Sequence, residues 1–292
     1  FIMNGGTMTG INVQNSGTFS MNGGTISGYE GSKNVILNTG TFAMSGESEI
    51  SNNMVTGNDL IQNEGTFTMT GGKITGNEAI GKVLLIFKIK RSTFINKGTF
   101  TMSGGEISNN KADGKGGGLL IDVTGSAELK GNAKITGNAA ETGGGIFINA
   151  DSGGNFGRLT LSGDVEISGN KADGYGGGIY AGGVSQSPSL TIEGNVKITD
   201  NTAVKGAGVY LSHAALKMTG GTISGNHDDN LYYVVDDDKV ERIHPASIEG
   251  YGHFHPVCGE ASCTHDAHPG VNWDPISSFE ELRNIQSAGY YY

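Results

Sequence analysis

The chain has 292 residues, of which 51 are glycine and 5 are proline; 16% are charged, and the formal net charge is −10. Charged residues make up roughly 25% of an average soluble protein, so this chain is poor in charge. Nucleic-acid binding calls for a basic stripe, and the acidic balance excludes nucleic acid as an expected partner. A membrane-spanning helix needs about 18 or more consecutive apolar residues, and the sequence has no such run.

One motif recurs along most of the chain. Its clearest copy, residues 65–77, reads GTFTMTGGKITGN. The position of Phe67 is occupied in successive copies by Phe1, Phe19, Phe42, Phe67, Phe100, Ala127, Leu159, Leu190 and Leu216. A second apolar anchor follows at Met8, Ile26, Ile50, Ile74, Ile107, Ile135, Ile167, Ile198 and Ile223. The mean spacing of about 27 residues lies in the range of solenoid proteins.

Each copy contains three short apolar runs separated by Gly, Asn and Asp, which are turn residues. The first run, Phe67-Thr68-Met69, alternates, which predicts a strand with Phe and Met on one face. The second begins at the anchor, and the third is LLI at 119–121 or IFI at 146–148. A leucine-rich repeat would need a helix in every copy, and no helical periodicity appears there. We therefore predict an all-β, right-handed parallel β-helix solenoid over residues 1–250, with about nine coils of three short strands each, followed by an irregular C-terminal extension.

Asparagine recurs at the end of the second run. The positions are Asn53, Asn77, Asn110, Asn138, Asn170, Asn201 and Asn226. Asparagine tolerates left-handed backbone geometry, and stacked Asn side chains hydrogen-bond as ladders. We therefore predict that these residues form structural corners rather than glycan sites. Beside the second-run anchors, Glu and Lys alternate from Glu49 to Lys197, which predicts a ladder of opposite charges between coils.

One segment departs from the repeat. Residues 82–91 read KVLLIFKIKR, an apolar run with basic ends inside the longest interval between copies. Two interpretations stay open. The segment is an ordinary third strand with a longer loop, or else an extra strand that protrudes from the rod or an edge for self-association.

The only two cysteines lie in a Cys/His-rich segment, residues 251–275, which we interpret as a linker. The candidate metal ligands are Cys258, Cys263, His265, His268, His255 and His253. Thiolate and imidazole are the ligands of structural zinc, which could staple a segment too short to form a core. A Cys258–Cys263 disulfide and free thiols are the alternatives. Upstream, the acidic residues at 228–229 and 236–238 are expected to form a solvated turn, with a calcium site as the alternative.

The repeat resembles the right-handed β-helix segments of large surface proteins from gut Gram-positive bacteria. The match rests on the FTMxGGxITGN pattern followed by GGGIY, and it covers roughly residues 1–235. It belongs broadly with pectate-lyase-like β-helices, and it is similar to the GGxI repeats of polymorphic outer-membrane adhesins. The Cys/His segment also resembles stretches that lie between β-helix blocks in such proteins. Residues 276–292 then correspond to the start of a truncated following module, so we expect a fragment of a longer protein.

The resemblance implies an adhesin-like, non-enzymatic segment that is secreted or displayed on the bacterial cell surface. Its expected partners are host or dietary glycans or surface proteins. The alternative is a polysaccharide lyase or glycoside hydrolase on the same scaffold, which would need clustered carboxylates. Three tyrosines are candidates for a binding patch, with core or corner packing as the alternative interpretation: Tyr175, Tyr180 and Tyr210. Apart from structural zinc, no cofactor is expected.

Overall fold

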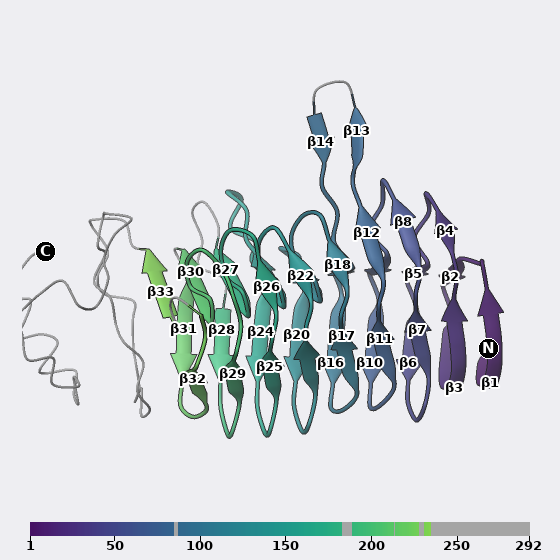
Figure 1. Cartoon of the computed structure of the whole chain (residues 1–292). Coiled ribbons are helices and arrows are strands. Elements are labelled where there is room, and N and C mark those ends of the chain that lie inside the picture. Colours follow the sequence, from purple (N-terminus) through teal and green to yellow (C-terminus); the bar gives the residue numbers. More distant parts are fainter. Residues whose placement is uncertain (85–86, 183–188, 213, 228–230, 235–292) are drawn as a thin grey trace, which may run out of the picture.

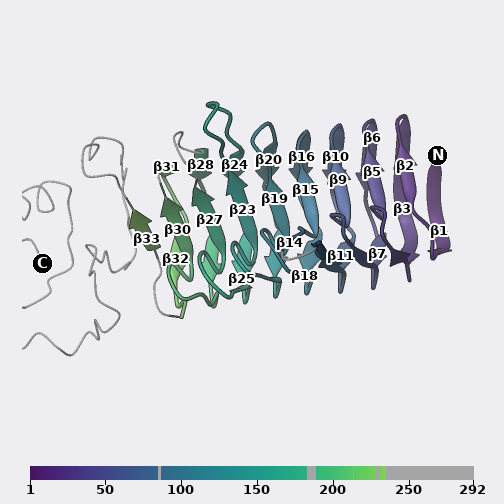
Figure 2. The ribbon, with the colours of Figure 1, turned by 90° about the horizontal axis from the view of Figure 1, so that it is seen from above.

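A computed structural model describes residues 1–84, 87–182, 189–212, 214–227 and 231–234. Within these ranges every regular element is a β-strand, and all strands except the two of one projecting hairpin stack side by side in parallel sheets along one axis (Figures 1 and 2). This arrangement is consistent with the expected parallel β-helix solenoid. None of the described residues forms a helix long and apolar enough to cross a membrane. The segments 251–275 and 276–292 lie outside the described residues.

The first apolar run of each copy forms a column of parallel strands. These are β1 (Ile2–Thr9), β3 (Thr18–Ser27), β6 (Thr41–Met44), β10 (Thr66–Met69), β16 (Thr99–Met102), β20 (Ser126–Leu129), β24 (Arg158–Leu161), β28 (Ser189–Ile192) and β31 (Ala215–Met218). Alignment of the internal repeats with one another predicted the register of these strands. Phe67, for example, pairs with Phe42 on one side and Phe100 on the other.

The second apolar run forms the continuation of the same 16-stranded sheet. Its strands are β7 (Glu49–Ser51), β11 (Lys73–Thr75), β17 (Glu106–Ser108), β21 (Lys134–Thr136), β25 (Glu166–Ser168), β29 (Lys197–Thr199) and β32 (Thr222–Ser224). The long strand β3 pairs with both β6 and β7 and so joins the two halves. The isoleucine anchors lie in register from coil to coil, as Ile74 does with Ile50 and Ile107.

The third apolar run forms a separate nine-stranded parallel sheet. Its strands are β2 (Val13–Asn15), β5 (Ile36–Asn38), β9 (Ile61–Asn63), β15 (Phe94–Asn96), β19 (Leu119–Ile121), β23 (Ile146–Asn149), β27 (Ile179–Gly182), β30 (Val209–Ser212) and β33 (Leu231–Val234). This sheet carries the aromatic positions considered below.

Six very short strands form a further parallel sheet between the second and third runs. They are β4 (Glu30–Gly31), β8 (Met54–Thr56), β12 (Glu78–Ile80), β18 (Lys111–Ala112), β22 (Ala139–Ala140) and β26 (Lys171–Ala172). The expectation of three strands per coil missed this sheet. Four of the six strands contain only two residues, which is too few to show the alternation by which strands are recognised.

The interior is a column of aligned apolar side chains. Phe42, Phe67 and Phe100 are fully buried, as are the isoleucine anchors of the central coils. The Phe42 and Phe67 rings stack with their centres 4.8 Å apart. Beyond Phe100 the column continues with Ala127 and then leucines, so the aromatic part of the core belongs to the N-terminal coils.

The recurring asparagines form the predicted ladder. From Asn53 to Asn226 the Nδ2 group of each one donates to the Oδ1 atom of the next, at 2.9 to 3.1 Å. Their predicted left-handed backbone was wrong by one residue. The positive φ lies at the preceding residue, which is Asn52, Gly76, Asn109, Gly137, Gly169, Asp200 or Gly225. Glycine, asparagine and aspartate are the residues that adopt this conformation most readily.

A second asparagine ladder closes the third run of the N-terminal coils. Asn15, Asn38, Asn63 and Asn96 are linked by Nδ2–Oδ1 hydrogen bonds of 2.7 Å. Each of these Nδ2 groups also donates to a carbonyl of the next first-run strand, and Asn96 keeps this bond, to Ser126, but has no asparagine partner in the next coil. The two halves of the molecule therefore share one ladder and differ in the other.

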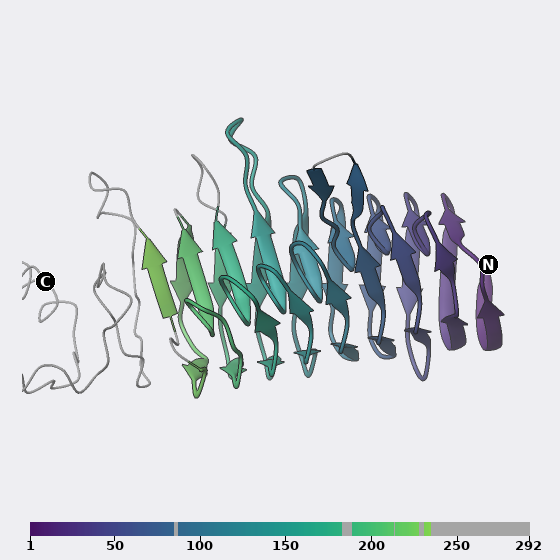
Figure 3. The ribbon, with the colours of Figure 1, turned by 45° about the horizontal axis from the view of Figure 1, so that its top comes forward.

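Residues 82–91 include an antiparallel hairpin that projects from the stack (Figures 1 and 3). Its strands are β13 (Lys82–Leu84) and β14 (Phe87–Ile89). The third-run strand of this coil is β15, which lies further along the chain. The interpretation as an ordinary third strand was therefore wrong, and the interpretation as a protruding element is confirmed.

Candidate functional site

The predicted zinc ligands lie outside the described residues. This holds for all six: Cys258, Cys263, His265, His268, His255 and His253. The acidic segments at 228–229 and 236–238 also lie outside them. Within the part of the chain that the structure describes, no cluster of three or more His, Cys, Asp or Glu side chains is placed to hold a metal ion.

The charged column predicted on the second-run strands is present in register. Lys134 lies between Glu106 and Glu166, and its Nζ atom is 3.0 Å from a carboxylate oxygen of Glu166. The Ser168 hydroxyl also donates to Glu166 at 2.7 Å. The Ser168 hydrogen bond, together with that from Lys134, lowers the pKa of Glu166. The alternating charges are explained as contacts that favour the correct register between coils.

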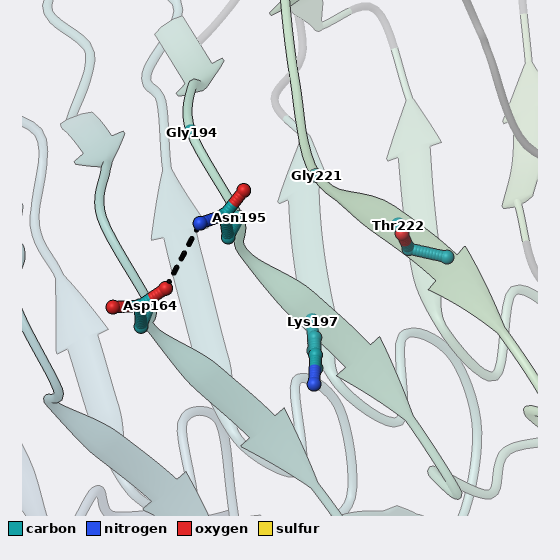
Figure 4. A pocket seen from close by; sticks show the side chains of 6 residues that line it. All are labelled: Asp164, Gly194, Asn195, Lys197, Gly221 and Thr222. Carbon is teal, nitrogen blue, oxygen red and sulfur yellow. Dashed lines mark hydrogen bonds between the residues drawn. The ribbon is translucent and has the colours of Figure 1, made fainter.

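A shallow depression of about 470 Å³ lies at the C-terminal end of this column (Figure 4). Its lining residues are Asp164, Gly194, Asn195, Lys197, Gly221 and Thr222. The Asn195 amide donates to Asp164 at 3.1 Å. The lining is polar and includes no aromatic ring, so the depression offers hydrogen bonds but no apolar platform for a ligand.

Three aromatic rings stack on the third-run sheet. Phe147, Tyr180 and Tyr210 occupy one register position on β23, β27 and β30. The ring centres of Phe147 and Tyr180 are 4.7 Å apart with 4° between their planes, and those of Tyr180 and Tyr210 are 5.2 Å apart with 6°. None of the three belongs to the main core cluster, whereas their strand neighbours Ile146 and Ile179 do. The rings therefore lie on the side of the sheet that faces away from the core.

A loop preceding each of these strands packs onto the rings. The Tyr175 ring lies 4.9 Å from the Tyr210 ring at an angle of 32°. Gly176 has a φ of +67°, and a Cβ atom there would lie 2.7 Å from the Cβ of Tyr180. A residue with a side chain would be strained at position 176, and its side chain would push the turn away from the Tyr180 ring. We call Phe147, Tyr175, Tyr180 and Tyr210 the aromatic patch.

A lysine borders the patch on the side of the N-terminal coils. The Lys115 ammonium lies 4.5 Å from the centre of the Phe147 ring, within the range of a cation–π interaction. Desolvation lowers the pKa of Lys115, while the nearby carboxylates of Asp122 and Glu141 act in the opposite direction. Neither Lys115 nor Phe147 was predicted as a site residue. Lys115 comes directly before one Gly-Gly-Gly run, and Phe147 lies two residues after the next such run. These positions beside the glycine runs were the signal that could have found them.

The members of the patch differ in exposure, and the binding role of the tyrosines stays a prediction. Tyr210 is 9% exposed and packs as the corner interpretation expected. Phe147, which that interpretation did not include, is 2% exposed. Tyr180 is half-buried, and its burial raises the pKa of its hydroxyl. Tyr175 is 43% exposed, so it is the ring of the patch that is most available to a ligand.

The patch is confined to the later coils. In earlier coils the same register position carries Gln14, Leu37, Gln62, Ile95 and Leu120. A passive stalk would be uniform from coil to coil, whereas this outer face changes from polar and aliphatic to aromatic. That difference makes the aromatic patch the best candidate for a functional site.

Comparison with known proteins provides no assignment. No protein-family model matches the chain, and neither the curated proteins nor the solved structures contain a significant match.

Proposed function

We propose that this chain is a non-enzymatic, adhesin-like segment of a larger bacterial surface protein, located outside the cell. Its β-solenoid would act as a rigid scaffold that displays the aromatic patch to glycans or proteins. The carrying observation is the exposed Tyr175 ring, backed by Tyr210. Tyrosine supplies a large, amphipathic contact at low cost in side-chain entropy, which is why it is enriched at binding surfaces.

The proposal includes the finer geometry of the solenoid. We infer nine right-handed coils, because the third-run sheet has nine strands and crossovers between parallel strands of one sheet are right-handed in about 98% of cases. In such a scaffold each coil contacts only its neighbours, so a surface patch spans several coils along one face. The patch fits this description, since its residues come from successive coils.

A screen of the intact chain on arrays of glycans and extracellular host proteins tests the proposal. Reproducible retention of a related set of ligands, with no loss of polysaccharide chain length during incubation, is the expected result. The absence of any retained ligand would contradict the adhesive role. New reducing ends or unsaturated products in the incubated polysaccharides would instead support the enzymatic alternative.

A further inference from the structure

Two pairs of tyrosine rings are in contact within the aromatic patch. Tyr180 and Tyr210 share a register position on the neighbouring strands β27 and β30 (Figures 1 and 2), and their ring centres are 5.2 Å apart with 6° between the planes. Tyr175 lies in the loop before β27, and its ring is 4.9 Å from that of Tyr210 at an angle of 32°. Neighbouring phenol rings have a chemistry of their own, because two tyrosines that each lose an electron and a proton can join through their ring carbons.

The repeats contain no cysteine that could link the coils covalently. The only two cysteines of the chain are Cys258 and Cys263, beyond the repeats. The coils that the structure describes are held together by backbone hydrogen bonds, asparagine ladders and packing. An oxidative link between coils would therefore have to use another side chain, and the phenol of tyrosine is one that one-electron oxidants attack.

The exposure of the rings indicates where an oxidant would act first. Tyr175 is 43% exposed, whereas Tyr210 is 9% exposed, so an oxidant in solution reaches Tyr175 more readily. Because the two rings are in contact, Tyr210 can reduce the Tyr175 radical and become the radical itself. Tyr175 can then be oxidised a second time, which makes it the entry point for both oxidations.

The ring geometry distinguishes Tyr175 from Tyr180 as the partner of Tyr210. A carbon–carbon bond joins the edges of two rings, so one ring has to turn out of a face-to-face stack before the bond forms. Tyr180 is held between the nearly parallel rings of Phe147 and Tyr210, at 4.7 and 5.2 Å. Tyr175 is already tilted from the plane of Tyr210 and is open to solvent. Tyr175 is therefore the ring that can turn to meet Tyr210.

Backbone hydrogen bonds keep Tyr175 beside the next coil. Its carbonyl accepts from the Gly143 N–H of the preceding coil at 2.9 Å. On the other side, the Gly176 N–H donates to the Lys205 carbonyl at 3.1 Å, and Tyr175 pairs with Lys205 in an isolated parallel bridge. The loop is thus fixed to the coils before and after it, so the Tyr175 ring stays against Tyr210 while its side chain turns.

We propose that Tyr175 and Tyr210 form a site of oxidative cross-linking, at which a one-electron oxidant of the peroxidase class joins them as dityrosine. Each phenol loses one electron and one proton, and hydrogen peroxide accepts both electrons and both protons and is reduced to two molecules of water. The two radicals form a bond between ring carbons adjacent to the phenol carbons, and the hydrogen atoms of the bonded carbons move to the phenol oxygens. The product fastens two successive coils covalently, whether or not the patch binds a ligand.

Treatment of the intact chain with a haem peroxidase and hydrogen peroxide tests this proposal. The monomer is separated by size exclusion, digested with trypsin and mapped by tandem mass spectrometry. Trypsin places Tyr210 on the peptide 206–217. Tyr175 and Tyr180 share the peptide 172–197. We expect these two peptides to be joined with the loss of two hydrogen atoms, and fragment ions to place the link at Tyr175.

The peptide map decides the outcome, because the chain has ten tyrosines and dityrosine fluorescence alone does not identify the pair. An oxidised monomer that lacks the joined peptides, or that carries dityrosine only at other positions, would overturn the proposal. A link between the same peptides at Tyr180 would overturn the assignment of Tyr175.

Two phenylalanine variants provide the matched comparison. Tyr175→Phe removes the phenol and keeps the ring, so it should abolish the joined peptides. Tyr180→Phe removes a phenol from the same patch and the same tryptic peptide, and it should leave the yield of joined peptides unchanged. The opposite result would contradict the proposal.

Urea denaturation provides a second readout. A covalent bond between coils constrains the unfolded chain as a disulfide does, so the cross-linked monomer should unfold at a higher urea midpoint than the untreated chain. Tyr175→Phe treated in the same way should show no such rise. An equal rise in both proteins would show that oxidation elsewhere causes the shift.

Discussion

The asparagine ladder makes a quantitative prediction about stability. Asn138 lies in its middle and is fully buried. Its Nδ2 group donates to the Ile107 carbonyl at 2.9 Å and to Asn170 Oδ1 at 3.1 Å. Its Oδ1 atom accepts from both the backbone N–H and the Nδ2 group of Asn110 at 3.0 Å. Substitution of Asn138 by alanine removes all four hydrogen bonds.

The expected loss follows from what is left without a partner. After Asn138→Ala, the Asn170 Oδ1 atom still accepts from the backbone N–H of residue 138, and Asn110 Nδ2 still donates to the Ile74 carbonyl. The Ile107 carbonyl and the Asn110 N–H lose these partners in a buried environment. At about 1–3 kcal/mol for each such group, the free energy of unfolding should fall by roughly 2–6 kcal/mol.

Urea denaturation followed by circular dichroism measures this change, with Asn195→Ala as the matched control. Asn195 is exposed and makes one side-chain hydrogen bond, to Asp164 at 3.1 Å, so its substitution should cost less than about 0.5 kcal/mol. Because coils interact chiefly with their neighbours, the whole transition curve should be compared and not only its midpoint. Equal, small effects of the two substitutions would refute the reasoning that the ladder holds the coils together.

Three further predictions concern other positions. Thr93 is fully buried, and its hydroxyl has no hydrogen-bond partner. It lies one residue before its strand, at the place that Val35 occupies in an earlier coil. Thr93→Val should therefore raise the free energy of unfolding by about 1 kcal/mol in urea denaturation, and a loss of similar size would contradict this. Gly137 has a φ of +64°, and a Cβ atom there would lie 2.6 Å from Asn109 Oδ1. Gly137→Ala should therefore lower the free energy of unfolding by about 1–2 kcal/mol and lower the midpoint of thermal unfolding. An unchanged midpoint would show that the corner tolerates a side chain. Burial raises the pKa of Asp59 above 3.8, so the folded state binds a proton more readily than the unfolded state, and its stability should fall as pH rises from 3.8 through the raised pKa. Asp59→Asn should lack that fall in a series of unfolding curves across pH, and a variant with the same pH profile as the wild type would exclude this carboxyl as the cause.

The core register could be predicted from the sequence because the same residue types return at the same place. Phe, Met and Ile at fixed offsets align the first and second runs without reference to any distant contact, and the pairing of Phe67 with Phe42 and Phe100 followed directly. The asparagine ladder was predictable for the same reason. In a solenoid, neighbours in space are equivalent positions of successive repeats.

Features that are very short or that occur in few coils were harder to predict. The strand Lys111–Ala112 contains two residues and shows no apolar alternation. The hairpin at residues 82–91 interrupts the repeat once, so no second copy indicates its geometry. The aromatic patch was recognised only in part, because Phe147 resembles a core residue in the run IFI, and its outward position becomes clear only in register with Tyr180.

Affinity measurements on site variants test the central claim, which is that ligand binding takes place at the aromatic patch. The strongest ligand from the array screen would be titrated against the wild type, Tyr175→Ser and the control Val204→Ser, which also removes exposed apolar surface. We predict about tenfold weaker binding for Tyr175→Ser, as expected for the loss of one aromatic contact of about 1–1.5 kcal/mol, and unchanged binding for Val204→Ser. Equal affinities for the wild type and Tyr175→Ser would contradict the assignment of this patch as the binding site.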